Sequence, residues 1–184
     1  MKNKSRFCIV ITLLFLLAGW LPSNPVLAGG SSAQLTDLVA QLQKCPETAW
    51  EEGQELREQI IKLVATMPHK PELPEGLDEL MGEAKAAVKN AKSPLDYNQG
   101  VDAFNQASLL APWEADIYYN LGVVQEKAED FERSMNSFTL YLLAKPNAKD
   151  KRQVKEKIGS LQYEVKKADL SGWYVYKYTK GGET

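Results

Sequence analysis

The chain has 184 residues, of which 44% are hydrophobic and 25% are charged, and its formal net charge is −2. This is the composition of an ordinary soluble domain, and the length suffices for one core with a tail but not for two large domains. A slightly acidic chain lacks the positive surface on which nucleic-acid binding depends, so the composition argues against a nucleic-acid partner.

The first 28 residues have the pattern of a secretory signal peptide. Lys2, Lys4 and Arg6 precede an apolar run over residues 7–21, and residues 26–28 (Val-Leu-Ala) supply a small-residue cleavage site. An uncleaved membrane anchor is the alternative, but the run has 15 residues, whereas a membrane-spanning helix needs about 20. We therefore expect cleavage after Ala28 and a periplasmic or secreted protein without stable membrane insertion.

Cleavage would change both the charge and the cysteine content of the chain. It would leave 19 Lys and Arg against 24 Asp and Glu, which is a net charge of −5. Cys45 would be the sole thiol, so no intramolecular disulfide could form even in an oxidising compartment. Cys45 is then either a cysteine for an intermolecular disulfide or a small apolar residue near a helix start. The stability of the fold must come from helix packing.

The N-terminal part of the mature chain predicts a helical hairpin over residues 29–67. After a loose leader at residues 29–32, Leu35, Leu38, Val39 and Leu42 recur at the spacing of one helical face. A second helix is expected to start at Pro46, which suits the first helical position, and to run to about Met67. Three prolines at residues 68–74 then block helix formation and predict an extended connector.

Residues 75–168 predict five further helices. Prolines at positions 94, 112 and 146 end the first, second and fourth of them, because proline and the residue before it both disfavour helix. The last helix is strongly charged, with an apolar stripe that starts at Val154. Its lysine-rich face is either solvated or directed at an acidic partner. These patterns predict an all-α fold of short antiparallel hairpins.

Residues 169–184 form a tail of different character. Within it, residues 171–178 (Ser-Gly-Trp-Tyr-Val-Tyr-Lys-Tyr) are rich in aromatic and β-branched residues, as strands are. A lone strand needs a neighbour. We therefore expect this tail to add to a sheet edge of another protein or to pair with a second copy of the chain.

An internal repeat is the strongest signal in the sequence. Several pairs of similar or identical positions are each separated by 34 residues, among them Phe104 and Phe138, Pro112 and Pro146, and Tyr97 and Phe131. A period of this length is typical of arrays of helix–turn–helix units.

The second unit, residues 115–148, resembles the tetratricopeptide repeat (TPR) motif. Tyr118 stands for the motif tryptophan, Leu121 and Gly122 for its leucine and glycine, Phe138 for its phenylalanine, and Pro146 for its final proline. The first unit, residues 81–114, keeps only the second-helix half of the motif. The resemblance implies an α-α superhelix of stacked hairpins. Because such repeats usually need three or more units, the N-terminal hairpin and the last helix are expected to act as caps.

The same resemblance implies a peptide groove lined by the first helix of each hairpin. Its inner face would carry Lys85, Lys89 and Lys92 from the first unit, and Asp116, Tyr119, Asn120, Val123 and Glu126 from the second. Asn120 stands at the motif position that holds a peptide backbone, and the lysine strip favours an acidic partner segment. The alternative is that Tyr119 and Asn120 support hairpin packing and that the lysines are solvated.

The sequence contains no recognisable catalytic or metal-binding constellation. His69 is the single histidine, and it lies in the connector with no nucleophile near it in the sequence. One cysteine and one histidine do not make a zinc site. We therefore predict a non-enzymatic protein without metal or cofactor that acts as a protein-binding adaptor or scaffold in the cell envelope. The alternative is a structural subunit of an envelope assembly, joined through its tail.

Overall fold

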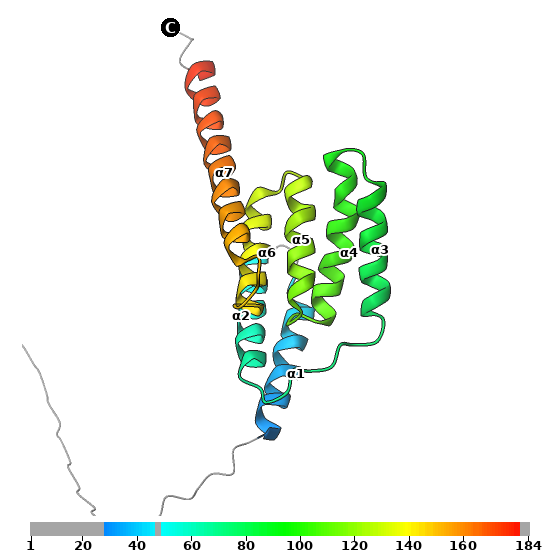
Figure 1. The fold of residues 1–184 in the computed structure, drawn as a ribbon. Helices are drawn as coiled ribbons and strands as arrows, with labels where there is room; N and C mark the ends of the chain where they lie inside the picture. The colour runs from blue at the N-terminus through cyan, green and yellow to red at the C-terminus, as the bar shows by residue number, and fades with distance from the viewer. Residues whose placement is uncertain (1–27, 47–48, 181–184) are drawn as a thin grey trace, which may run out of the picture.

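The computed structural model describes residues 28–46 and 49–180, and all regular secondary structure within them is helical (Figure 1). The expected signal peptide therefore lies outside the described residues, apart from Ala28. The helices are α1 (Ala28–Lys44), α2 (Trp50–Ala65), α3 (Leu77–Asn90), α4 (Tyr97–Leu110), α5 (Ala115–Lys127), α6 (Phe131–Ala144) and α7 (Lys151–Lys180), and a 3-10 helix, η1 (Pro94–Asp96), precedes α4. The predicted all-α class is confirmed for the described chain.

The ends of α4 and α6 agree with the predicted ones because local signals set them. Pro112 and Pro146 follow α4 and α6 at the expected places. Asp130 caps α6 by accepting the Arg133 backbone N–H at 3.3 Å, which satisfies one of the amides that a helix start leaves unpaired.

Two expectations for the N-terminal hairpin were wrong. The leader at residues 29–32 is helical, because α1 already begins at Ala28. The second helix begins at Trp50 and not at Pro46. The Ala49 N–H donates to the Pro46 carbonyl at 2.9 Å, and α2 begins only after both residues.

Successive helices from α3 to α7 pack as neighbours (Figure 1). Phe104, Tyr118 and Phe138 are the largest fully buried side chains and fill the space between these helices. The first part of α7 closes the array with Val154 and Leu161, which are buried in the same cluster as Tyr118 and Phe138.

The N-terminal hairpin packs on the second helices of the two repeat units, with α2 against α6 and α1 against α4. Trp113, in the turn between α4 and α5, is 8% exposed and belongs to the same core cluster as Leu42, Ile60 and Val64 of the hairpin. An ion pair anchors the connector beside this turn, because the Lys70 Nζ lies 2.8 Å from the Glu114 carboxylate. The hairpin and the repeat units therefore share one apolar core.

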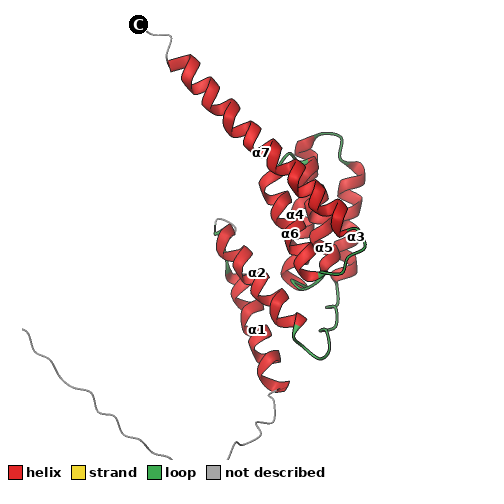
Figure 2. Ribbon diagram, turned by 60° about the vertical axis from the view of Figure 1, so that its left-hand side comes forward, coloured by secondary structure: helices red, strands yellow, loops and turns green. Residues whose placement is uncertain are grey.

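The tail is helical and not a strand, which corrects the prediction for residues 171–178. Helix α7 continues through this segment to Lys180 and leads away from the other helices (Figures 1 and 2). A lone strand leaves its backbone groups unpaired, whereas extending an existing helix adds one hydrogen bond per residue. Residues 152–180 contain no proline that would stop the helix. In the part of the chain that the structure describes, no helix combines the length and apolar character needed to cross a membrane.

Candidate functional site

Helix α5 presents five of the predicted groove residues on one side. Asp116, Tyr119, Asn120, Val123 and Glu126, here called the α5 face, stand at positions i, i+3, i+4, i+7 and i+10 of a single helix, so their side chains leave it in similar directions. Tyr119 is one of the few large hydrophobic side chains with substantial exposure, at 36%. This face therefore offers an aromatic ring to solvent.

Two other rings support the ring of Tyr119. It meets Phe138 edge-on, with 5.9 Å between the ring centroids, and Tyr141 at 5.2 Å, both from α6. Edge-to-face contacts of this kind hold an aromatic side chain in place. Tyr119 is therefore both packed and exposed, so the two interpretations of this residue from the sequence are compatible.

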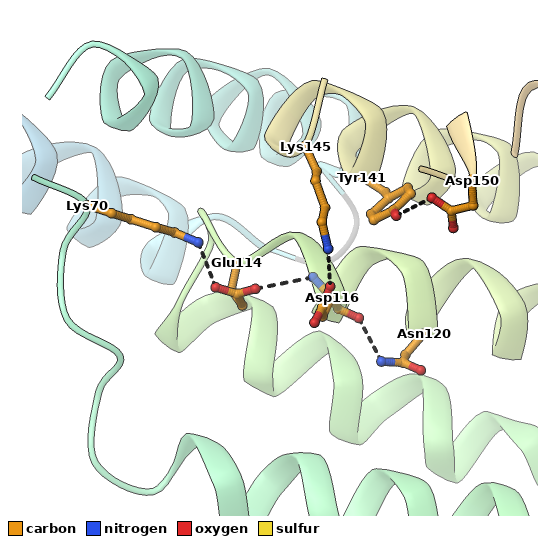
Figure 3. Close-up of polar contacts among 7 residues, drawn as sticks. All are labelled: Lys70, Glu114, Asp116, Asn120, Tyr141, Lys145 and Asp150. Atoms are coloured by element: carbon orange, nitrogen blue, oxygen red, sulfur yellow. Dashed lines mark hydrogen bonds and ion pairs between the residues drawn. The ribbon is translucent and has the colours of Figure 1, made fainter. Parts of the chain in front are cut away.

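Tyr141 is fixed in turn by the segment before α7. Its hydroxyl donates to the Asp150 carboxylate at 2.7 Å (Figure 3). Burial raises the pKa of Tyr141, and the hydrogen bond to Asp150 raises it further, because both favour the protonated phenol. The hydroxyl therefore keeps its proton and its bond to Asp150 at physiological pH.

Ion pairs frame the α5 face at both ends. At one end the Lys145 Nζ lies 3.4 Å from the Asp116 carboxylate (Figure 3). At the other end the Lys157 Nζ of α7 lies 2.5 Å from the Glu126 carboxylate and 5.8 Å from the centroid of the Phe138 ring. The two acidic residues of the predicted groove are thus paired with lysines from elsewhere in the fold.

Asn120 and Val123 occupy the middle of the face. The Asn120 Nδ2 donates to the Asp116 backbone carbonyl at 2.7 Å (Figure 3), which leaves its amide oxygen as an acceptor without a bond inside the described chain. Val123 is partly buried against the cluster that contains Tyr118 and Phe138. Only Asn120 and Tyr119 therefore offer polar groups that are not paired to another side chain here.

The lysines predicted for the first unit do not join this arrangement. Lys85, Lys89 and Lys92 are exposed on or just after α3, and within the described residues their side chains make no hydrogen bond or ion pair. Helix α3 packs on α4, and α4 packs on α5 (Figure 1). A groove that the lysine strip shares with the α5 face therefore stays a prediction.

Tyr141 and Lys157, which complete the site, were not among the predicted groove residues. The lysine-rich face of the last helix was interpreted only as solvated or directed at an acidic partner. The last helix itself was a signal for this contact. It is long, and it follows the second unit at the place where the first helix of a third hairpin would lie. With that placement, a residue of α7 is expected beside α5.

Compared with known proteins, the chain matches no protein-family model and no curated protein. In the described residues, no group of three or more His, Cys, Asp or Glu side chains is arranged to hold a metal ion.

Proposed function

We propose that this protein is an exported, non-enzymatic adaptor or scaffold of the cell envelope that binds a protein or peptide partner on its α5 face. The single observation that carries the proposal is Tyr119, an exposed ring supported by Phe138 and Tyr141. Rigid exposed tyrosines bury a large area on binding at little entropic cost, and they are enriched among residues that dominate binding energy.

The arrangement of the helices supports a TPR-like reading of this face. The pairs α3–α4 and α5–α6 pack in succession, and α7 follows them. The α5 face belongs to the first helix of the second hairpin, which lines the groove in a TPR array. The free amide oxygen of Asn120 beside Tyr119 can accept an N–H from an extended peptide backbone.

The charge on the partner follows from the ion pairs. Lys145 and Lys157 bring positive charge to the two ends of the α5 face, but Asp116 and Glu126 already neutralise them. An acidic segment would bind by taking over the lysines from these exposed pairs, which are worth little in water. The partner that fits best has an apolar or aromatic residue for Tyr119 and acidic residues at its ends.

A photo-crosslinking amino acid placed at Tyr119 tests the proposal. Tyr163 provides a matched control site, because it is also a tyrosine and is 66% exposed but lies on α7. The variants are crosslinked in living cells and their adducts identified. A specific adduct from position 119, absent from position 163 and reduced by changing Lys145 and Lys157 to Ala, is expected. Equal adducts from both positions would contradict binding at the α5 face.

A structural role is the second candidate, because the end of α7 extends beyond the other helices (Figures 1 and 2). Since this end is helical, we propose that any such contact uses a helix and not an added strand. A chain that ends at residue 170 separates the two functions. Loss of an oligomer in sedimentation, with the Tyr119 adduct retained, would assign self-assembly to the tail and partner binding to the α5 face.

A further inference from the structure

A cleft lies between part of the N-terminal hairpin and the repeat units, away from the α5 face. Its volume is about 450 Å³, and its lining comes from α1 and α2 on one side and from α4, α5 and α6 on the other. This volume is in the range of small-molecule sites, and such sites often form where two packed units meet.

Arg57 of α2 is the notable polar group in this cleft. Its guanidinium is partly buried, with the Nη1 donating to the Gly53 carbonyl at 3.1 Å and the Nη2 donating to the Ser108 hydroxyl at 3.2 Å. Both acceptors are neutral. Within the described residues Arg57 forms no ion pair with a carboxylate, although a partly buried cation is normally paired.

The surroundings hold this guanidinium in position. A side chain at Gly53 would begin 3.1 Å from the Arg57 Nη1, so the glycine leaves room for the guanidinium beside the helix. Ser108 is fully buried, and its hydroxyl also donates to the Asn105 carbonyl at 2.7 Å. Burial raises the pKa of Tyr118, and the Arg57 charge and a hydrogen bond from the Arg57 side chain both oppose this rise. The arginine is thus pre-organised, with N–H groups left over for a ligand.

The other charged groups of the cleft do not neutralise Arg57. Asp130 caps α6 and pairs with Arg133 at 3.3 Å. Arg133 in turn lies 5.9 Å from the centroid of the Trp50 ring. Asp102 is exposed on α4, where water weakens its field at Arg57. Among the described residues that line the cleft, only Arg57 is a partly dehydrated charge without a counter-ion.

We propose that the cleft binds a monocarboxylate attached to an apolar body. The carboxylate would accept two parallel N–H bonds from Arg57, the geometry that a guanidinium favours. The apolar body would lie against Leu42, Trp50, Leu109 and Leu121, which line the same cleft. A free carboxylic acid and an apolar C-terminal residue of a peptide share this chemistry. The proposal is independent of the adaptor function, because no residue of the α5 face lines the cleft.

Isothermal titration calorimetry tests this inference. The protein is purified from cells that export and process it, with no further truncation. The ligands are octanoate, octanol, octylamine, and the tripeptide Ala-Leu-Leu with a free or an amidated C-terminus. We expect saturable binding of octanoate or of the free peptide, and at least roughly tenfold weaker binding of the neutral and cationic analogues. Octanoate binding identifies a free acid as a source, and binding of the free peptide alone identifies a peptide terminus.

Arg57→Gln should weaken binding roughly tenfold or more, whereas Arg152→Gln on the exposed side of α7 should leave it unchanged. Asp102→Asn should tighten binding if the cleft holds an anion. If the Arg57 variant fails to fold, NMR of the backbone amides of the unaltered chain tests the proposal instead. Adding the ligand should shift the amide signals of Gly53 and Ser108. The proposal is overturned if no carboxylate binds, if octanol binds as well as octanoate, or if the signals of Gly53 and Ser108 do not move.

Discussion

Gly122 of α5 lies directly against the ring of Phe138 of α6. A Cβ atom at position 122 would lie 3.0 Å from three carbons of that ring, closer than a normal van der Waals contact. Phe138 is fully buried, so the ring has little space to move. The Ser134 hydroxyl also donates to the Gly122 carbonyl at 2.7 Å. The close approach of α5 and α6 therefore depends on a missing side chain.

Gly122→Ala should lower the free energy of unfolding by about 1–3 kcal/mol, because the added methyl group overpacks a well-filled core. Gly159→Ala is the matched control. It lies within α7, and a Cβ there would have no neighbour within 4 Å, so the change should be neutral or stabilise the helix by about 0.5–1 kcal/mol. Urea unfolding of both variants measures the difference. Equal effects at the two positions would mean that α5 and α6 do not meet closely at Gly122.

The parts of the fold that were predicted correctly depend on local patterns. Proline positions and helical spacing are properties of neighbouring residues, so the ends of α4 and α6 could be deduced before any packing was known. The shared face of Asp116, Tyr119 and Glu126 follows in the same way from their spacing on one helix. The predicted role of this face in binding stays a prediction.

Contacts between residues that are far apart in the sequence could not be predicted in this way. Nothing local to Lys157 indicates that it pairs with Glu126, which is 31 positions away. The same holds for Arg57 and Ser108, which meet only because α1 and α2 pack on α4 and α6. The tail was assigned by side-chain alternation, but a lone strand has no partner, and the preceding helix could simply continue.

Leu161 should be a principal anchor of α7. It is 3% exposed and packs in the cluster that contains Tyr118 and Phe138. Leu161→Ala should cost about 2–5 kcal/mol of the free energy of unfolding, the range for buried leucines. Tyr163→Ala, two positions along the same helix and 66% exposed, should change it by no more than about 0.5 kcal/mol. Thermal unfolding compares the two. A Tyr163 variant that is the less stable one would show that α7 packs through its other side.

A buried polar pair should make a measurable contribution between α5 and α6. The Ser137 hydroxyl donates to the Gln125 Oε1 at 2.6 Å, and Gln125 is only 3% exposed. Ser137→Ala leaves the buried amide oxygen without this donor and should cost about 1–3 kcal/mol. Adding Gln125→Met removes the buried amide oxygen that has lost its donor. The double variant should therefore be more stable than the sum of the two single changes implies, and strict additivity in urea unfolding would show that the bond contributes nothing.

The loop between α3 and α4 should give the fold a defined acid sensitivity through Asp96. This carboxylate accepts the backbone N–H groups of Lys92 at 3.0 Å and Ser93 at 2.9 Å. The bond from Lys92, followed by those from the Ser93 side chain and backbone, holds the pKa of Asp96 below its ordinary value of 3.8. The folded state has a lower pKa than the unfolded state. The stabilisation by Asp96 is therefore complete above the ordinary pKa of the unfolded chain, and it is lost as the pH falls through the folded pKa.

An NMR titration of the Asp96 side chain should therefore give a pKa below 3.8. Asp96→Asn, which cannot ionise, should be less stable than the unaltered chain near neutral pH. The gap between the two proteins in free energy of unfolding should shrink as the pH is lowered from about 6 to about 2. The direction in which this gap changes with pH tests the prediction. A gap that widens in acid would mean that the folded state favours the protonated carboxyl, and that Lys92 and Ser93 do not stabilise the charged form.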